Sequence, residues 1–95
     1  MSNIIDTWTL NYRPEDGGRI MGTLTVTDVD VQFSSADLDE DIVLPRPNIA
    51  SAEAARRRLL NRAVVTMKDG QRHVFEYGLL SVGPIVDAIS TMLDA

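Results

Sequence analysis

Hydrophobic and polar residues alternate along the stretch Gly22–Phe33, GTLTVTDVDVQF. Leu24 and Val26 alternate with threonines, and the alternation resumes over Val29–Phe33 after a polar break at Asp28. A period of two places successive side chains on opposite faces of a β-strand. The stretch therefore predicts two half-buried antiparallel strands joined by a tight turn. Gly22 has no side chain to pack, so it predicts a bulge or a sharp bend.

Similar alternation recurs along most of the chain, and the C-terminal part has a different period. Apolar residues at i, i+3, i+4 and i+7 from Val82 to Leu93 predict an amphipathic helix, with Ser81 as its cap and Pro84 in its first turn. We expect one domain over residues 1–95. Its strands are predicted over about residues 6–12, 19–27, 29–34, 42–44, 49–56, 62–68 and 71–77, and its helix over about residues 82–93.

The stretch Ile49–Asn61 admits two structures. Alanine, glutamate, arginine and leucine are strong helix formers, and Ala52, Ala55 and Leu59 fall at helical spacing. The same length between two strands also fits a strand over about Ile49–Arg56 followed by a turn. We favour the strand because of the family resemblance given below.

The sequence Arg62–Tyr77 has the clearest hairpin signal, because Asp69-Gly70 is typical of a two-residue turn. With that turn, Val64 faces Phe75 on the inner side. The outer side then carries an apolar patch edged by charge, which is typical of a protein contact surface. A register slip of one residue, or a covering loop, would hide this patch. The predicted interface comprises Val65, Met67, Arg72 and Val74, and on this register Val65→Lys would split a dimer without harming the fold.

Composition limits the classes of function. The 95 residues are 44% hydrophobic, as in an ordinary soluble domain, and the lack of cysteine excludes disulfides and thiolate chemistry. The first residues show no secretory signal and no apolar run is long enough to span a membrane, so we expect a cytoplasmic protein. The net charge of −5 works against broad binding to nucleic acid or to anionic membranes.

No pattern typical of an active site or a metal site is present. His73 is the only histidine, and zinc lacks its usual ligands without cysteine or a second histidine. The alternating aspartates of Asp37–Asp41 resemble the start of a calcium loop, but Ile42 and Asn48 stand where glycine and glutamate are needed. No nucleophile-elbow serine or glycine-rich phosphate loop occurs. We expect no enzyme, no metal and no cofactor, and no nucleic-acid partner, since the aromatic residues fall on inward strand positions.

The order of the predicted elements and several short segments support a family resemblance. These segments are Gly22–Asp28 with Val31–Phe33, Ile42–Pro45 with Asn48-Ile49, and Val64–Gly70 with His73–Phe75, followed by the closing helix. In this order the chain resembles the GRAM and bacterial pleckstrin-homology-like (PH-like) families. The resemblance implies a mainly β barrel of about seven antiparallel strands, in two roughly orthogonal sheets, closed by one C-terminal helix. The implied core comprises Trp8, Leu24, Val26, Phe33, Phe75, Ile85, Val86 and Ile89.

The resemblance also implies function. We expect a non-catalytic protein-interaction module that binds a protein partner or itself, as a homodimer. The alternative is a phosphoinositide or anionic-lipid binder, in which basic residues at the first hairpin loop hold headgroup phosphates. Arg13 and Arg19 flank that loop here, but Glu15 and Asp16 lie between them. Asp28 and Asp30 also stand at the next turn, where many GRAM sequences have a basic residue.

The second basic group lies near the middle of the chain, and its arginines would join Arg13 and Arg19 in any anion site. Guanidinium groups suit phosphate and carboxylate equally. These arginines would otherwise pair with the acidic loop Asp37–Asp41 or solvate an edge. In a strand they alternate between two faces, which spreads their charge. The residues of the group are Arg56, Arg57, Arg58 and Arg62.

Overall fold

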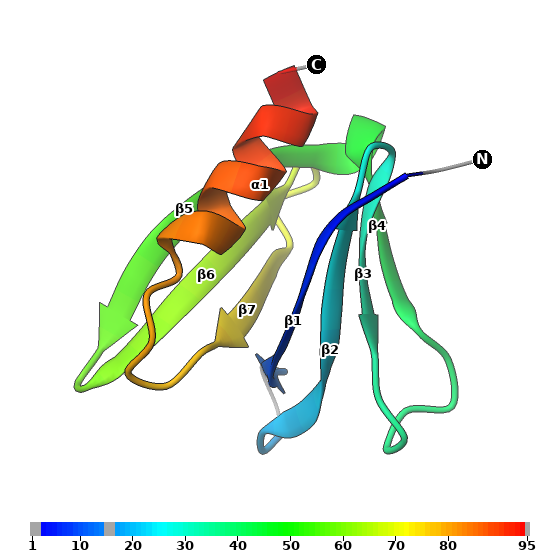
Figure 1. Cartoon of the computed structure of the whole chain (residues 1–95). Coiled ribbons are helices and arrows are strands. Elements are labelled where there is room, and N and C mark those ends of the chain that lie inside the picture. Colours follow the sequence, from blue (N-terminus) through cyan, green and yellow to red (C-terminus); the bar gives the residue numbers. More distant parts are fainter. Residues whose placement is uncertain (1–2, 15–16, 95) are drawn as a thin grey trace.

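Seven antiparallel strands and one C-terminal helix make up the fold in a computed structural model, which describes residues 3–14 and 17–94 (Figure 1). The mainly β class is confirmed, and every predicted element is present with ends within two residues of those expected. No helix in these ranges is both long and apolar enough to cross a membrane. The elements are β1 (Ile4–Arg13), β2 (Ile20–Thr27), β3 (Asp30–Ser34), β4 (Ile42–Pro45), a short 3-10 helix (Arg46–Asn48), β5 (Ile49–Arg57), β6 (Leu60–Met67), β7 (Arg72–Glu76) and α1 (Gly83–Asp94).

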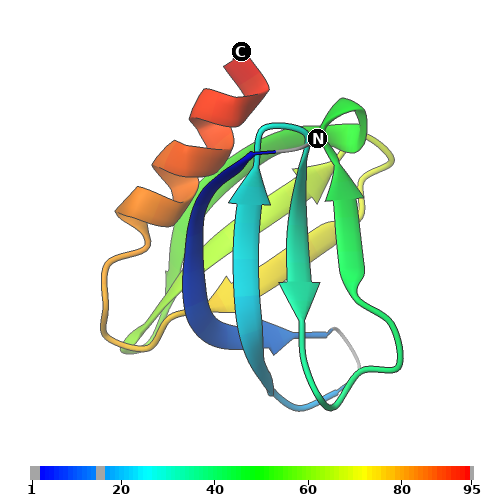
Figure 2. The same ribbon diagram turned by 45° about the vertical axis from the view of Figure 1, so that its right-hand side comes forward.

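The strands form one hydrogen-bonded sheet in the order β4-β3-β2-β1-β7-β6-β5. β1 pairs with β2 over Ile4–Tyr12 but with β7 only over Asn11–Arg13. The sheet bends at this junction, so its two halves, β1–β4 and β5–β7, run across one another (Figures 1 and 2). The two expected sheets are therefore the two halves of one continuous sheet, and α1 lies along β5.

The core fills the space between the two halves of the sheet and beneath α1. Rings from three strands meet at its centre, with centroids 5.4 to 5.9 Å apart among Tyr12, Phe33 and Phe75. Of the expected core residues, Trp8 and Val86 are only partly buried and pack against its margin. The others are confirmed as buried: Leu24, Val26, Phe33, Phe75, Ile85 and Ile89.

Gly22 allows a close approach between strands. A Cβ at this position would collide with the carbonyl oxygen of Ser34 and with the ring of Phe33. The β1–β2 register runs without a shift past Gly22, and its irregularity lies between Ile4 and Asp6. Of the bulge or sharp bend predicted at Gly22, the bulge is therefore wrong, and glycine is required there because β3 passes too close for a side chain.

The ambiguous central stretch is a strand, as we favoured. β5 pairs with β6 from Ile49 to Arg57, and the chain reverses through Arg58-Leu59 with Arg58 at φ 55°. The helix-forming composition is overridden because an isolated helix of this length is only marginally stable, whereas the sheet edge supplies a hydrogen-bonding partner along the segment.

The β6–β7 hairpin has a different register from the predicted one. The Gly70 N–H donates to the Met67 carbonyl (3.0 Å) and the Met67 N–H donates to the Gln71 carbonyl (2.8 Å). The loop thus comprises the three residues Lys68–Gly70, with Gly70 at φ 91°, instead of the two-residue turn. The extra residue makes Val65 face His73 and shifts the pairing by one position.

This shift overturns part of the predicted protein interface. Because the side-chain period of a strand is two, a slip of one residue exchanges the two faces of β6, while β7 keeps the faces predicted for it. Val65 and Met67 belong to the core, with 0% and 7% of their surface exposed. Arg72 and Val74 do lie on the outer face, opposite the core. The predicted apolar patch of Val65, Met67 and Val74 is therefore wrong in two of its three apolar residues.

Val65→Lys is expected to destabilise the fold rather than spare it, because it places an ammonium group in the core. The free energy of unfolding should fall by more than about 4 kcal/mol. Val43→Lys, which makes the same change at a position 49% exposed on β4, should cost about 0.5 kcal/mol. Urea denaturation followed by circular dichroism measures both values. Equal stability of the two variants would contradict the observed register.

Candidate functional site: an arginine cluster around Glu76

Glu76 is a buried carboxylate on the outer face of the sheet, at the junction between its two halves. It ends β7 and lies between its cross-strand neighbours Arg62 on β6 and Asn11 on β1. Only 2% of its surface is exposed. The Nε and Nη2 atoms of Arg62 each lie 2.8 Å from Oε2, which makes a short, charge-assisted contact. Arg62 thus supplies the main compensation for burying this charge.

Two further arginines approach the other oxygen of Glu76. The Arg13 Nη1 and the Arg19 Nε each lie 3.8 Å from Oε1. These distances are too long for hydrogen bonds, and Oε1 is buried without a hydrogen-bond partner among the described residues. One carboxylate therefore faces guanidinium groups from the end of β1, the residue just before β2 and the first half of β6.

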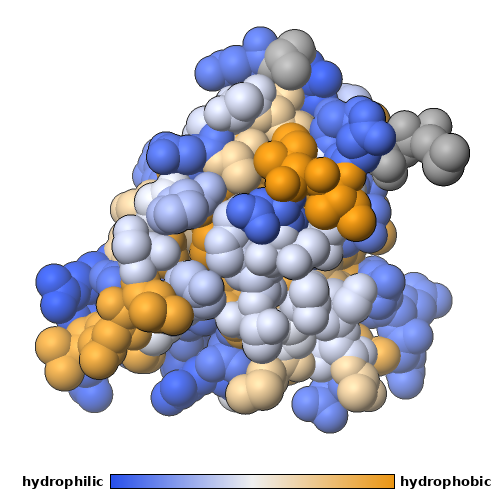
Figure 3. Space-filling view, in the orientation of Figure 1, coloured by the Kyte–Doolittle hydropathy of each residue, from blue (hydrophilic) through white to orange (hydrophobic). Residues whose placement is uncertain are grey.

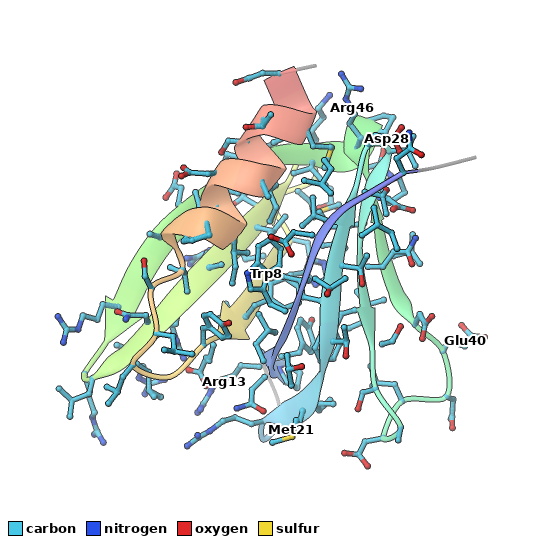
Figure 4. All side chains as sticks on the ribbon, viewed as in Figure 1. Trp8, Arg13, Met21, Asp28, Glu40 and Arg46 are labelled. Carbon is cyan, nitrogen blue, oxygen red and sulfur yellow. The ribbon has the colours of Figure 1, made fainter. Side chains whose placement is uncertain are left out.

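A hollow of about 280 Å³ beside Glu76 is lined by more arginine side chains. Arg57 from the end of β5 and Arg72 from the start of β7 line it together with Arg13 and Arg62. Figure 4 shows Arg13 at one end of the molecule, far from Arg46. We refer to Arg13, Arg19, Arg57, Arg62 and Arg72 as the arginine cluster.

The arginine cluster has an excess of positive charge. The cluster contains five arginines, and Glu76 is the one carboxylate that contacts any of them among the described residues, so these six residues carry a formal charge of +4. Arg57 and Arg72 are exposed and make no ion pair within residues 3–14 and 17–94. Like charges held together raise the free energy of the surface, and an anion that bound there would lower it. The geometry suits a carboxylate or a phosphate group.

The structure brings four of the six predicted anion-binding residues into the arginine cluster: Arg13, Arg19, Arg57 and Arg62. Arg56 lies on the opposite face of β5, and Arg58 lies in the turn beyond it. The suggested pairing of the central arginines with Asp37–Asp41 does not occur among the described residues. The acidic loop residues Glu15 and Asp16 lie outside the described part of the chain.

Sequence reasoning missed the roles of Glu76 and Arg72 in this site. The signal that could have found Glu76 is its position opposite Arg62. On the two-residue turn, Arg62 would face Tyr77 instead, so the one-residue error in register concealed the ion pair. Arg72 was predicted to lie in a protein interface, and in the structure it lines a hollow together with arginines of other strands.

His73 belongs to the core side of the same hairpin. The Tyr12 hydroxyl lies 3.0 Å from Nδ1, and 7% of the histidine surface is exposed. Burial lowers the pKa of His73 below its ordinary value of 6.5, and nearby Asp69 opposes this shift in part. The imidazole is therefore neutral at pH 7 and packs as a buried residue on the core side of β7.

A larger hollow lies elsewhere, between the start of β5 and the end of α1. It has a volume of about 830 Å³ and is lined largely by small side chains, with Arg46 and Lys68 at its margin. Residues 3–14 and 17–94 contain no group of three or more histidines and carboxylates placed to hold a metal ion.

Comparison with known proteins supports the fold alone. No protein-family model matches the sequence, and no curated protein matches it significantly. The C-terminal domain of an unknown protein from Leishmania infantum has a similar structure, with a TM-score of 0.80, 13% identity, and coverage of 97% of this chain and 85% of that one. A chain of the 8S snRNP assembly intermediate has a TM-score of 0.74 and 13% identity, over 96% of this chain and 82% of that one.

Glu76→Gln is expected to destabilise the fold by about 2 kcal/mol, because it leaves the arginine cluster without its internal anion. Glu40→Gln is the matched control, since Glu40 is exposed and makes no described ion pair; it should change stability by less than about 0.5 kcal/mol. Chemical denaturation at low and high salt measures both. A Glu76→Gln protein as stable as the native one would show that the ion pairs contribute nothing.

The lowered pKa of His73 predicts that acid weakens the fold. Between the folded pKa and 6.5 the unfolded chain binds more protons, so stability is full above 6.5 and declines as pH falls through this window. The free energy of unfolding should therefore decrease from about pH 7.5 to about pH 5.5. His73→Gln should show a smaller decrease, since this is the only histidine. Identical pH profiles would contradict the assignment.

Proposed function

We propose that this chain is a non-catalytic binding module of PH-like or GRAM-like architecture, whose arginine cluster holds an acidic segment of a protein partner. The observation that carries the proposal is that three arginines approach one buried carboxylate, Glu76, while Arg57 and Arg72 line a hollow together with two of those arginines. Arg57 and Arg72 are exposed at the hollow with no described acidic partner. Their side chains are available to an external anion.

The ion pair inside the cluster supports a carboxylate as the ligand. Arg62 already holds Glu76 through two nitrogens at 2.8 Å from one carboxylate oxygen. An aspartate or glutamate side chain of a partner would meet Arg57 and Arg72 with the same chemistry. Several such residues in one extended segment would contact the hollow and the exposed part of Arg13 together.

A flat anionic membrane fits this surface less well than a peptide does. Figure 4 shows Glu40, in the acidic loop between β3 and β4, at the same end of the molecule as Arg13 and Met21. A membrane placed against that end would meet the acidic loop as well as the arginines, and the net charge of −5 would oppose its approach. A peptide is small enough to contact the arginine cluster alone.

The structural comparison adds limited support for a role in protein assembly. One neighbour in fold is a chain of the 8S snRNP assembly intermediate. At 13% identity this likeness concerns the fold and transfers no partner. It is consistent with a fold that serves within a multicomponent assembly.

The test is a titration of a fluorescein-labelled hexaglutamate peptide, followed by fluorescence anisotropy at low and at physiological salt. We expect saturable binding that Arg72→Ala weakens about two- to fivefold, because one exposed charge contact is lost. Arg46→Ala removes the same charge at the far end of the molecule and should leave the affinity unchanged. Salt should weaken binding without abolishing it.

Two outcomes would overturn the proposal. If Arg72→Ala and Arg46→Ala weakened hexaglutamate binding equally, the peptide would be attracted by overall charge and not bound at the arginine cluster. Binding to phosphatidylcholine vesicles that contain a phosphatidylinositol bisphosphate, lost in Arg72→Ala while hexaglutamate fails to bind, would assign the cluster to a lipid headgroup.

A further inference from the structure

β5 forms an open edge of the sheet. The strand order begins with β4 and ends with β5, so each has a partner on one side only within the described chain. β4 has four residues and ends in Pro45, whereas β5 extends over nine residues. In Figure 1 the tip of the β5–β6 hairpin extends beyond the first turn of α1, and residues 53–59 in this part of the hairpin are exposed. β5 is the longer template for another strand.

The hydrogen bonds of β6 show which groups of β5 point outward. The N–H and carbonyl of Asn61 bond to Gly78 and Tyr77, on the β7 side. Backbone N–H and carbonyl groups alternate in direction along a strand, so those of Arg62 and Val64 point to β5. There Arg62 pairs with Ala55 and Val64 pairs with Glu53. The intervening residues of β5 therefore direct their N–H and carbonyl groups to the open edge. These residues are Ala52, Ala54 and Arg56.

The charges of β5 favour one pairing of this edge with itself. In an antiparallel pair centred on Ala55, Glu53 of one copy lies directly opposite Arg57 of the other, twice by symmetry. Both residues are on the same face of the sheet and both are exposed. A pair centred on Glu53 or on Arg56 would instead place like charges opposite each other, which is unfavourable. A pair centred on Ala54 would place Glu53 opposite an alanine.

The same register also pairs the outward N–H and carbonyl groups of β5 in the two copies. It brings Ala54 opposite Arg56 of the second copy, and both residues present outward N–H and carbonyl groups, so they form hydrogen-bonded pairs on each side of the axis. Glu53 and Arg57 then occupy the closer, non-hydrogen-bonded positions, which suit a side-chain contact. Ala55 lies on the axis, where its small side chain permits close approach.

We propose that a second copy of this chain pairs antiparallel with β5 about Ala55 and continues the sheet across a two-fold axis. This contact also covers exposed apolar surface. Leu59, 65% exposed in the turn, would lie opposite Ser51 of the second copy. Figure 3 shows hydrophobic side chains gathered at the tip of this hairpin. Self-association does not depend on ligand binding by the arginine cluster, although Arg57 belongs to both surfaces.

A charge exchange tests the register by sedimentation equilibrium over a range of protein concentrations. Glu53→Arg and Arg57→Glu should each raise the dimer dissociation constant roughly tenfold, because two attractive contacts become repulsive. The double variant should return to within about threefold of the native value. Within one chain Glu53 and Arg57 are four residues apart on a strand, too far to pair, so this rescue arises only between chains.

A pair of proline variants tests the edge itself. Ala54→Pro removes an outward N–H of β5 and leaves the bonds to β6 intact, so it should abolish the dimer. Val43→Pro is the matched control on the other open edge. The Arg46 N–H donates to the carbonyl of Val29, on the side of β4 where β3 lies. Because backbone groups alternate along a strand, the N–H and carbonyl of Val43 point to the open edge of β4. Val43→Pro should leave the dimer unchanged.

A native protein that stays monomeric at about 1 mM, where even weak association is populated, would overturn the proposal. Dissociation by Val43→Pro but not by Ala54→Pro would assign the contact to β4 and overturn it as well. Hexaglutamate binding by the monomeric Ala54→Pro variant reports separately on the arginine cluster. Each proposal can therefore fail without the other.

Discussion

The fold depends on the short contact between β1 and β7, which joins the two halves of the sheet through Asn11–Arg13. Its inner side is apolar, because Tyr12 brings Phe33 from one half against Phe75 from the other. Its outer side is ionic, because Glu76 is held there by Arg62 and approached by Arg13. The alternation of side chains along β1 and β7 produces both features, since neighbouring residues on a strand face opposite sides. The aromatic core and the arginine cluster are thus two faces of one junction.

This arrangement explains why a chain of net charge −5 carries a local cluster of arginines. The junction requires burial of one carboxylate, and a buried charge is costly unless cationic groups compensate it. Arg62 alone makes the close contact, while Arg13 and Arg19 remain at 3.8 Å. Arg57 and Arg72 add charge that burial of Glu76 does not require. Compensation of the buried Glu76 accounts for Arg62, Arg13 and Arg19. Arg57 and Arg72 have no such structural role, and they are the residues that support binding of a ligand.

Residue patterns were sufficient to predict the elements but not the faces of the last hairpin. Two-residue periodicity identifies a strand wherever one side is buried, as in β2 and β3, whose inward residues are those expected. Asp69-Gly70 is compatible with both a two-residue and a three-residue loop, because either places glycine at positive φ. The loop length depends on whether Val64 or Val65 packs in the core, and tertiary packing decides this. The one-residue difference moved Val65 inward and hid the pairing of Arg62 with Glu76. The structure of β5 likewise follows from its partner strand rather than from its composition.

The two proposed surfaces meet at Arg57, which both lines the hollow and stands on the open edge. In the proposed dimer Arg57 faces Glu53 of the second copy, so the second copy itself supplies an acidic side chain to the arginine cluster. The dimer would thus use part of the arginine cluster for the chemistry that we propose for an external partner. Two ligands that need the same guanidinium oppose each other, and the coupling is reciprocal. An acidic partner that occupies Arg57 would weaken self-association to the same degree that self-association weakens its binding. Arg72, Arg13 and Arg19 lie outside the edge contact, so the dimer would retain a reduced cluster rather than lose it.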